Sequence, residues 1–428
     1  MSRILLCLAA FALLLQAAFP AAGLAAGTDR LAAAGLKAAP SASSPSGAAL
    51  QTNAEAAALI DVSSGRILYS KAGDKRMRIA STTKIMTAII AIENGRLSDK
   101  VTVGKNAFGK EGSSIYLKLG EEISLNDLLY GLMLRSGNDA ATAIAEHVGG
   151  SQEGFVYLMN RKAEEIGMTR SHFSNPSGLD ADDHYSTADD MARLAAYALK
   201  NPVFREIVKT KTKRVSREGE SWDTVWTNKN KMLSLYPGSD GVKTGFTKLS
   251  RRCLVSSATR DGQQLAAVTL NDGSDWADHS RMLDFGYKHY PQTLAVKKGE
   301  DLGQGYTAAE DFAYPLAEGE SLERKLLPTN PKSVDYRLGD RGALELSFAG
   351  QKVGSVPLAV PAPAAPGKTA PGKTGKPTTG DQPTGRFSEV GEPTAAGVVQ
   401  ERRSGWLQRW PHTLADVLRA LIPGGEGS

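Results

Sequence analysis

The chain has 428 residues, of which 41% are hydrophobic and 23% are charged, so it can build more than one domain with a sizeable core. Its formal net charge is only +5. Because the globular part also lacks a basic stripe interleaved with aromatic residues, no nucleic-acid partner is expected.

The N-terminal segment predicts export. Residues 1–26 are typical of a secretory signal, with an apolar run from Ile4 to Phe19 and a small-x-small cleavage site at Gly23-Leu24-Ala25. An uncleaved N-terminal anchor is the alternative interpretation. Since Cys7 lies in this segment, the mature chain keeps only Cys253 and can form no internal disulfide.

A flexible spacer and then a buried helix are expected next. Residues 27–52 are rich in Ala, Ser, Gly and Pro, which indicates a spacer. Two apolar runs between residues 57 and 69 flank a Ser-Ser-Gly turn and predict a hairpin. The stretch from Ala80 to Asn94 is apolar on nearly every side, so it predicts a helix buried in the domain, with Gly95 at its C′ position.

Two reactive side chains stand near the start of this helix. Ser81 and Lys84 are three residues apart, which places them on the same helix face. The helix N-terminus adds unpaired N–H groups and a positive dipole end. The pair is therefore a candidate nucleophile with its own base, although a Ser and a Lys at this spacing also occur by chance.

A polar triplet separates two further helices. Ser124 is expected to cap a helix that ends at Arg135, and another helix is predicted from about Asp139 to Val148. The joint between them is Ser136-Gly137-Asn138. This joint is either a simple turn or the place where a hydroxyl and an amide line the wall of a site.

Other elements of this region follow from local patterns. Short strands are predicted at Val101–Val103 and Ile115–Leu117, and a helix from Gln152 to Ile166. Ser186, with Asp189 three residues later, predicts the start of a further helix.

The loop that begins at Phe173 carries acids but no metal-ligand spacing. We interpret Asp180, Asp182 and Asp183 as solvated loop residues. The six histidines of the chain show no His-Glu-x-x-His spacing, which disfavours a zinc peptidase. Neither a metal nor a cofactor is expected.

Residues 237–271 change to a strand pattern. Asp240–Thr247, Cys253–Thr259 and Leu265–Leu270 predict an antiparallel meander, and the apolar residues between Trp276 and Tyr287 predict a closing helix. Helices before and after an antiparallel sheet indicate an α+β domain, in which helices pack on the sheet around a central buried helix.

Three segments follow this domain. Residues 291–360 predict a small all-β domain. Residues 361–398 form a linker rich in Pro, Gly, Lys and Thr, which cannot bury enough apolar surface to fold. Residues 399–428 combine Trp and Leu at helical spacing with Arg, which predicts an amphipathic tail helix that anchors the protein to a membrane surface; packing on a partner protein is the alternative.

Three motifs together point to a family. Ser81-x-x-Lys84, Ser136-Gly137-Asn138 and Lys243-Thr244-Gly245 occur in the order known for the penicillin-recognising serine enzymes. The Gly in the second triplet resembles the low-molecular-mass penicillin-binding proteins, the D-alanyl-D-alanine carboxypeptidases. Residues 53–290 carry this resemblance, which implies a β-lactamase/transpeptidase-like catalytic domain. One departure is Leu249-Ser250-Arg251-Arg252, where small residues are expected.

The motif residues suit acyl transfer. Ser81 would attack the carbonyl of the terminal peptide bond and form an acyl-enzyme. Lys84 can act as its base only if the amine is neutral, and burial together with the charge of Lys243 would lower its pKa. Ser136 could relay the proton to the leaving amine, and Asn138 could hold both Lys84 and the substrate backbone.

The resemblance also implies how the substrate is bound. Lys243 and Thr244 would bind the free carboxylate, and the backbone N–H groups of Ser81 and Phe246 would form the oxyanion hole. Gly245 would let the substrate lie close to this strand as an added strand.

The implied substrate is a peptidoglycan stem peptide ending in D-Ala-D-Ala, and β-lactam antibiotics are the implied inhibitors. The implied location is the outer face of the bacterial cytoplasmic membrane. A serine β-lactamase and a non-catalytic sensor of β-lactams or wall peptides are the alternatives. The β-lactamase is disfavoured by Gly137 and by the absence of a Glu from the loop Asn175–Asp180.

Overall fold

The computed structural model describes residues 50–217 and 219–360. The predicted signal segment, nearly all of the predicted spacer, the linker and the amphipathic tail lie outside these residues. Within them, no helix is both long and apolar enough to cross a membrane.

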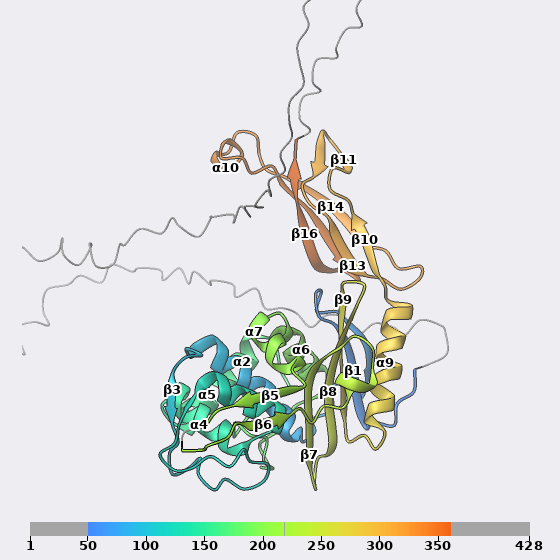
Figure 1. Ribbon diagram of the computed structural model, residues 1–428. Coiled ribbons are helices and arrows are strands. Elements are labelled where there is room, and N and C mark those ends of the chain that lie inside the picture. The colour runs from blue at the N-terminus through green and yellow to red at the C-terminus, as the bar shows by residue number, and fades with distance from the viewer. Residues whose placement is uncertain (1–49, 218, 361–428) are drawn as a thin grey trace, which may run out of the picture. The chain divides into compact units, whose positions relative to one another are not determined.

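A five-stranded antiparallel sheet forms the centre of the N-terminal part of the described chain (Figure 1). It contains both the predicted hairpin and the predicted meander. Because the first strand of the hairpin pairs with the last strand of the meander, segments some 200 residues apart lie side by side. The strand order is β2 (Ile67–Lys71), β1 (Ala56–Asp61), β9 (Gln263–Leu270), β8 (Arg251–Arg260) and β7 (Ser239–Thr247).

Helices cover both faces of this sheet (Figure 1). Successive side chains of a strand point to opposite faces, so Val255 of β8 belongs to the larger core cluster and Leu254 to the smaller one. The α9 helix (Asp275–His289) covers the smaller cluster. The predicted α+β class is confirmed. The larger cluster includes buried side chains from the helices on the other face, which are α2 (Lys84–Asn94), α4 (Asn138–Gly149), α5 (Gln152–Glu165), α6 (Ala188–Leu199) and α7 (Pro202–Lys209).

The predicted central helix exists and is buried, but its ends differ from expectation. It begins as the 3₁₀ turn η1 (Ala80–Thr83), which continues directly into α2. Gly95 follows α2 in an extended conformation, not the left-handed one that a C′ glycine adopts. Close packing explains this glycine, because a Cβ there would lie 2.5 Å from a methyl carbon of Leu125.

The helices around the polar triplet are confirmed, with one detail that only the structure reveals. Ser124 caps α3 (Leu125–Tyr130) by accepting a hydrogen bond from the backbone N–H of Asp127. The chain then widens into the π-helical turn η2 (Gly131–Arg135), directly before the triplet. Such turns are frequent at functional sites.

Two local predictions are wrong. The cap of α6 is Thr187, whose hydroxyl accepts from the N–H of Asp190, and not Ser186. Ile115–Leu117 does not form a strand, because the N–H groups of both residues donate to the carboxylate of Asp139. The partner of β3 (Lys100–Thr102) is instead β4 (Glu122–Ser124).

The sequence patterns did not predict three short elements between α7 and β7. The strands β5 (Thr212–Val215) and β6 (Thr224–Thr227) form an antiparallel hairpin. The short helix α8 (Met232–Leu235) follows them. The connection between β6 and α8 contains Lys229, which becomes important at the site.

The C-terminal described part is built mainly of strands, as expected. Leu344 and Leu346 alternate with more exposed neighbours and fill its core. One pair consists of β10 (Gln292–Val296) and β13 (Phe312–Pro315). The second sheet has the order β11 (Asp301–Gly303), β12 (Tyr306–Ala308), β16 (Gln351–Ala359), β15 (Gly342–Phe348) and β14 (Glu323–Pro328), and α10 (Val334–Arg337) lies between β14 and β15 in the chain.

Candidate active site

The backbone around Ser81 is held by close contacts from two other segments. Ala80 has a left-handed φ of 47°, which is unusual for a residue with a side chain. A Cβ on Gly178 would lie 1.9 Å from the Ala80 carbonyl oxygen, and one on Gly245 would lie 3.2 Å from the backbone nitrogen of Ser81. The 178 loop therefore requires glycine for its approach to η1, and at Gly245 a side chain would press on η1 as well. The predicted role of Gly245 toward the substrate stays a prediction.

The amine of Lys84 lies at the centre of a small polar cluster. Its Nζ is 3.1 Å from Oγ of Ser81, 2.7 Å from Oδ1 of Asn138 and 2.6 Å from the carbonyl oxygen of Ser177. These partners come from η1, α4 and the loop after α5. The structure therefore brings together Ser81, Lys84 and Asn138, three of the predicted site residues.

Burial and like charges act together on the lysines. Burial lowers the pKa of Lys84 well below its usual value, and the charges of Lys243 and Lys229 lower it further. Burial also lowers the pKa of Lys243 to about 7, with a contribution from Lys229. The expected influence of Lys243 on Lys84 is therefore present, although the amine of Lys243 donates to the carbonyl oxygen of Thr244 rather than to Lys84.

Ser136 and Asn138 stand on the joint between η2 and α4. Ser136 has a left-handed backbone with a φ of 66° and is almost fully buried. Asn138 is buried as well, and it uses all its polar groups: its Nδ2 donates to the carbonyl oxygen of Glu111 and its backbone N–H to that of Ser113. The joint is thus a rigid wall and not a simple turn.

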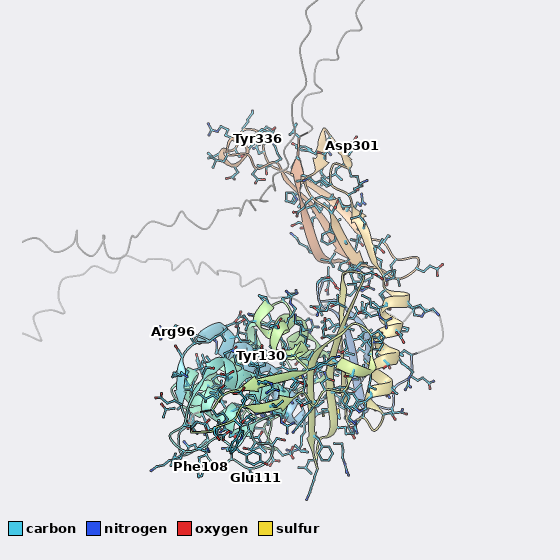
Figure 2. The ribbon with its side chains drawn as sticks, viewed as in Figure 1. Arg96, Phe108, Glu111, Tyr130, Asp301 and Tyr336 are labelled. Carbon is cyan, nitrogen blue, oxygen red and sulfur yellow. The ribbon has the colours of Figure 1, made fainter. Side chains whose placement is uncertain are left out.

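Asp139 organises this wall, and the sequence analysis did not select it. Its carboxylate accepts hydrogen bonds from the hydroxyl of Ser114 at 2.6 Å and from the N–H groups of Ile115 and Leu117 at 3.1 Å. The segment that it holds begins near Glu111, which is labelled in Figure 2. The sequence carries no signal for this role, because an acid in the first turn of a helix is ordinary and its burial is seen only in the structure.

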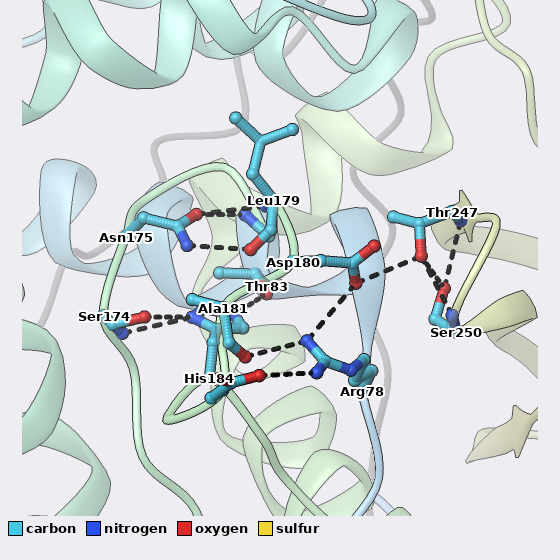
Figure 3. Close-up of polar contacts among 12 residues, drawn as sticks. Arg78, Thr83, Ser174, Asn175, Leu179, Asp180, Ala181, His184, Thr247 and Ser250 are labelled. Atoms are coloured by element: carbon cyan, nitrogen blue, oxygen red, sulfur yellow. Dashed lines mark hydrogen bonds and ion pairs between the residues drawn. The ribbon is translucent and has the colours of Figure 1, made fainter.

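The loop after α5 supports the helix that carries Ser81 (Figure 3). Asn175 closes the loop on itself by accepting from the N–H groups of Gly178 and Leu179. His184 accepts from the N–H of Ser174 and contacts the Thr83 hydroxyl at 2.8 Å. Burial lowers the pKa of His184 to about 4, so its ring is neutral at physiological pH.

The acids of the same loop are exposed, as predicted. Asp180 accepts a hydrogen bond from the Thr247 hydroxyl and lies 3.9 Å from Arg78 (Figure 3). In residues 50–217 and 219–360, no group of three His, Cys, Asp or Glu side chains is arranged to hold a metal ion.

A pocket of about 470 Å³ opens over Ser81. Lys84 and Lys243 are not among its lining residues, because they are buried behind it. Of the predicted site residues, Ser81, Ser136, Thr244, Gly245 and Phe246 line the pocket. The residues that were not predicted, and that complete the lining, are Ser113, Lys229, Arg252, Cys253, Asp275 and Trp276.

This arrangement can activate a hydroxyl. A serine and a lysine of lowered pKa share a buried polar cluster at the floor of an open pocket. One strand edge and one helix joint form its walls. These are the requirements of covalent catalysis by a serine that attacks a carbonyl group.

Comparison with known proteins gives a consistent result. The family model described as D-alanyl-D-alanine carboxypeptidase, peptidase S11, matches residues 40–274. The carboxypeptidase DacF of Bacillus subtilis is 34% identical over 333 residues, which cover 72% of this chain and 85% of DacF. DacC of Escherichia coli is 35% identical over 72% of this chain and 83% of its own length.

A solved structure agrees with these relatives. The crystal structure of the Streptomyces K15 DD-transpeptidase superposes with a TM-score of 0.53 at 33% sequence identity, and the match covers 56% of this chain and 98% of that protein. The predicted β-lactamase/transpeptidase-like fold is confirmed. This chain belongs to the D-alanyl-D-alanine carboxypeptidase family of serine peptidases, which are hydrolases of the penicillin-binding class.

Proposed function

We propose that the chain removes the terminal D-alanine from peptidoglycan stem peptides through an acyl-enzyme on Ser81, and that β-lactams acylate the same residue. The observation that carries this proposal is the hydrogen-bond pattern of Lys84. A neutral amine has two N–H donors and one lone pair. Asn138 Oδ1 and the Ser177 carbonyl oxygen accept the two donors, so the lone pair is left for the hydroxyl of Ser81.

The roles of the remaining residues follow from this starting point. Lys84 takes the proton from Ser81 as its oxygen attacks the carbonyl carbon, and the N–H groups of Ser81 and Phe246 stabilise the oxyanion. Ser136 passes the proton to the departing amine as the peptide bond breaks. Water then attacks the ester and releases the shortened peptide.

On the binding side, Thr244 and the strand around Gly245 receive the peptide, with Lys243 behind them. Asn138 holds Lys84 in place.

The test is a pair of assays on the full chain. The protein is given a peptide ending in D-Ala-D-Ala and, separately, a labelled penicillin. Release of D-Ala and a stable label on Ser81 are expected, and both are expected to vanish in Ser81→Ala. Ser221→Ala, a change at an exposed serine away from the pocket, serves as the control.

Two outcomes would contradict the proposal. Rapid turnover of penicillin without release of D-Ala would identify a β-lactamase. A stable label without any peptide turnover would identify a sensor.

We also propose that the enzyme works on the outer face of the cytoplasmic membrane, exported by residues 1–26 and held by residues 399–428. The support is the sequence pattern of these segments, which lie outside the described residues, together with a wall peptide as substrate. The full chain should sediment with anionic vesicles, and a chain that ends at residue 398 should not. Equal sedimentation of both would refute the anchor.

A further inference from the structure

The connection between β3 and β4 carries exposed apolar side chains beside the active-site pocket. Its residue Ser113 lines the pocket, and three residues later the side chain of Tyr116 is 81% exposed. Leu119 and Phe108 of the same connection are more than half exposed, and Phe108 is labelled at the edge of the molecule in Figure 2. A single exposed apolar side chain is ordinary, but three on one connection make it a candidate binding surface.

The backbone of Tyr116 adopts a conformation that a tyrosine rarely takes. Its φ is 60°, in the left-handed region that favours glycine. Residues strained in this way persist only where the surrounding structure holds them, and they gather at binding and catalytic sites. Because the fold alone would be served by glycine here, the aromatic ring itself is the reason to look for a ligand.

Three side chains hold this strained backbone in place. The carboxylate of Asp139 accepts from the N–H groups of the residues before and after Tyr116. The hydroxyl of Ser114 accepts from the N–H of Tyr116 itself at 2.8 Å, and the guanidinium of Arg217 donates to its carbonyl oxygen at 2.8 Å. The ring is therefore presented from a rigid base, so a ligand that binds to it pays little for ordering the chain.

The charges next to Tyr116 are paired. Arg217 forms an ion pair with Glu121 at 2.6 Å, and Lys118 forms one with Glu220 at 3.3 Å. A surface whose cations are matched in this way offers no excess charge of either sign to a partner. It therefore favours an uncharged ligand.

A sugar ring has the chemistry and the reach that this place requires. A pyranose has a face of C–H groups rimmed by hydroxyls, which matches the apolar face and single polar edge of a tyrosine. In a pentapeptide stem, four residues separate the scissile bond from the sugar, so the sugar lies at most about 14 Å away. Tyr116 is three residues from the pocket residue Ser113, which is at most about 11 Å of chain. The two ranges overlap.

We propose that Tyr116 stacks against an amino-sugar ring of the peptidoglycan glycan strand while the end of the stem peptide lies in the pocket. Tyr116 is then a specificity-determining residue, which favours stem peptides attached to glycan over free ones. The inference rests on the proposed function, since it names a second part of the same substrate.

The test varies the sugar and the ring together. Release of D-Ala is measured from a free pentapeptide ending in D-Ala-D-Ala and from the same pentapeptide attached to its disaccharide. The enzymes are the full chain, Tyr116→Ala, Tyr116→Trp and Tyr157→Ala. Tyr157 is the matched control, because it is 60% exposed on α5 and does not line the pocket.

The expected result is a selective loss. Tyr116→Ala should lower kcat/KM on the disaccharide pentapeptide by about 5- to 20-fold, mainly through KM, and stay within about twofold of the wild type on the free pentapeptide. Tyr116→Trp should keep the preference for the sugar, and Tyr157→Ala should change neither substrate. An equal loss on both substrates, no loss on either, or a loss on the free pentapeptide alone would overturn the inference.

Tyr116→Gly separates binding from folding. Glycine removes the ring and also relieves the left-handed backbone. The midpoint of urea unfolding should therefore equal or exceed that of the wild type, while the preference for the sugar is lost as in Tyr116→Ala. A lower midpoint together with an unchanged preference would show that the ring serves the fold, and would overturn the inference.

A binding measurement separates this inference from the proposed function. Ser81→Ala and the double variant Ser81→Ala/Tyr116→Ala are bound to beads that carry glycan strands without stem peptides. The double variant should bind about 5- to 20-fold more weakly. If the wild type releases no D-Ala but this difference is found, the proposed function fails and the role of Tyr116 stands. Equal binding of both variants would overturn the inference even where D-Ala is released.

Discussion

Replacement of Asp139 by Asn tests whether one buried carboxylate holds the wall of the active site. The carboxylate accepts from the hydroxyl of Ser114 and from the N–H groups of Ile115, Leu117 and Ala140. Asparagine has nearly the same size but presents an NH₂ group in place of one oxygen. In the place of Oδ1 this group leaves the N–H of Ala140 without its acceptor, and in the place of Oδ2 it leaves the hydroxyl of Ser114 and the N–H of Leu117 without theirs. A hydrogen bond to a charged group contributes about 1.5–3 kcal/mol, so the loss of one or two of them should lower the free energy of unfolding by about 1.5–6 kcal/mol.

Asp139→Asn should also slow the reaction of Ser81, because Asn138 links the wall segment to Lys84. Asn138 donates to the carbonyl oxygens of Glu111 and Ser113 in the wall segment, and its Oδ1 accepts from the amine of Lys84. A displaced wall therefore leaves the base less well oriented, and we expect the rate of Ser81 labelling by penicillin to fall at least about tenfold.

Urea denaturation followed by circular dichroism measures the free energy of unfolding of Asp139→Asn. Asp182→Asn is the control, since Asp182 is an exposed acid of another loop. If Asp139→Asn folds too poorly to study, Ser114→Ala removes one donor and should lower the free energy of unfolding by about 1–3 kcal/mol. A loss below about 1 kcal/mol in Asp139→Asn, equal to that of the control, would refute the reasoning.

Two further predictions concern the protonation of Lys84 and the backbone at Ser81. In Lys243→Gln the loss of a nearby positive charge raises the pKa of Lys84, so the acidic limb of the pH–rate profile for penicillin acylation should move to higher pH; a limb that stays in place or moves lower would contradict this. Gly178→Ala places a Cβ 1.9 Å from the Ala80 carbonyl oxygen and should abolish labelling, as measured by gel fluorescence. Gly262→Ala has the same positive φ but meets nothing within 4 Å, so it should cost about 1 kcal/mol of stability in thermal unfolding and leave labelling intact. If both glycine changes reduced labelling equally, backbone strain and not the contact with Ala80 would explain the loss in Gly178→Ala.

The sequence determined the elements whose patterns are local. The all-apolar stretch after Ser81 predicts a buried helix, and regular strand alternation with turn residues predicts the hairpin and the meander. The structure differs where a side chain competes for backbone groups. Ile115–Leu117 has the composition of a strand, yet its N–H groups bind Asp139, and that acid is distant enough in sequence to be invisible to a local pattern.

The residues of the site also divide into those that a sequence motif identifies and those that only the folded chain brings together. Ser81, Lys84 and Asn138 were selected from the order of three motifs that resembles a known family, because the Ser-Lys spacing alone also occurs by chance. Lys229 belongs to no such motif, since it lies in a short connection whose composition is ordinary.

Tertiary structure alone decided which charges act on the amine of Lys84. The proton affinity of Lys84 depends on how deeply the amine is buried and on the distance to Lys243 and Lys229, which come from separate segments of the chain. Desolvation and Coulomb interactions act through space and not along the sequence. Motif spacing could therefore select Lys84, but only the packing of α2 against β7 and the neighbouring loops explains why the pKa of its amine lies well below the usual value.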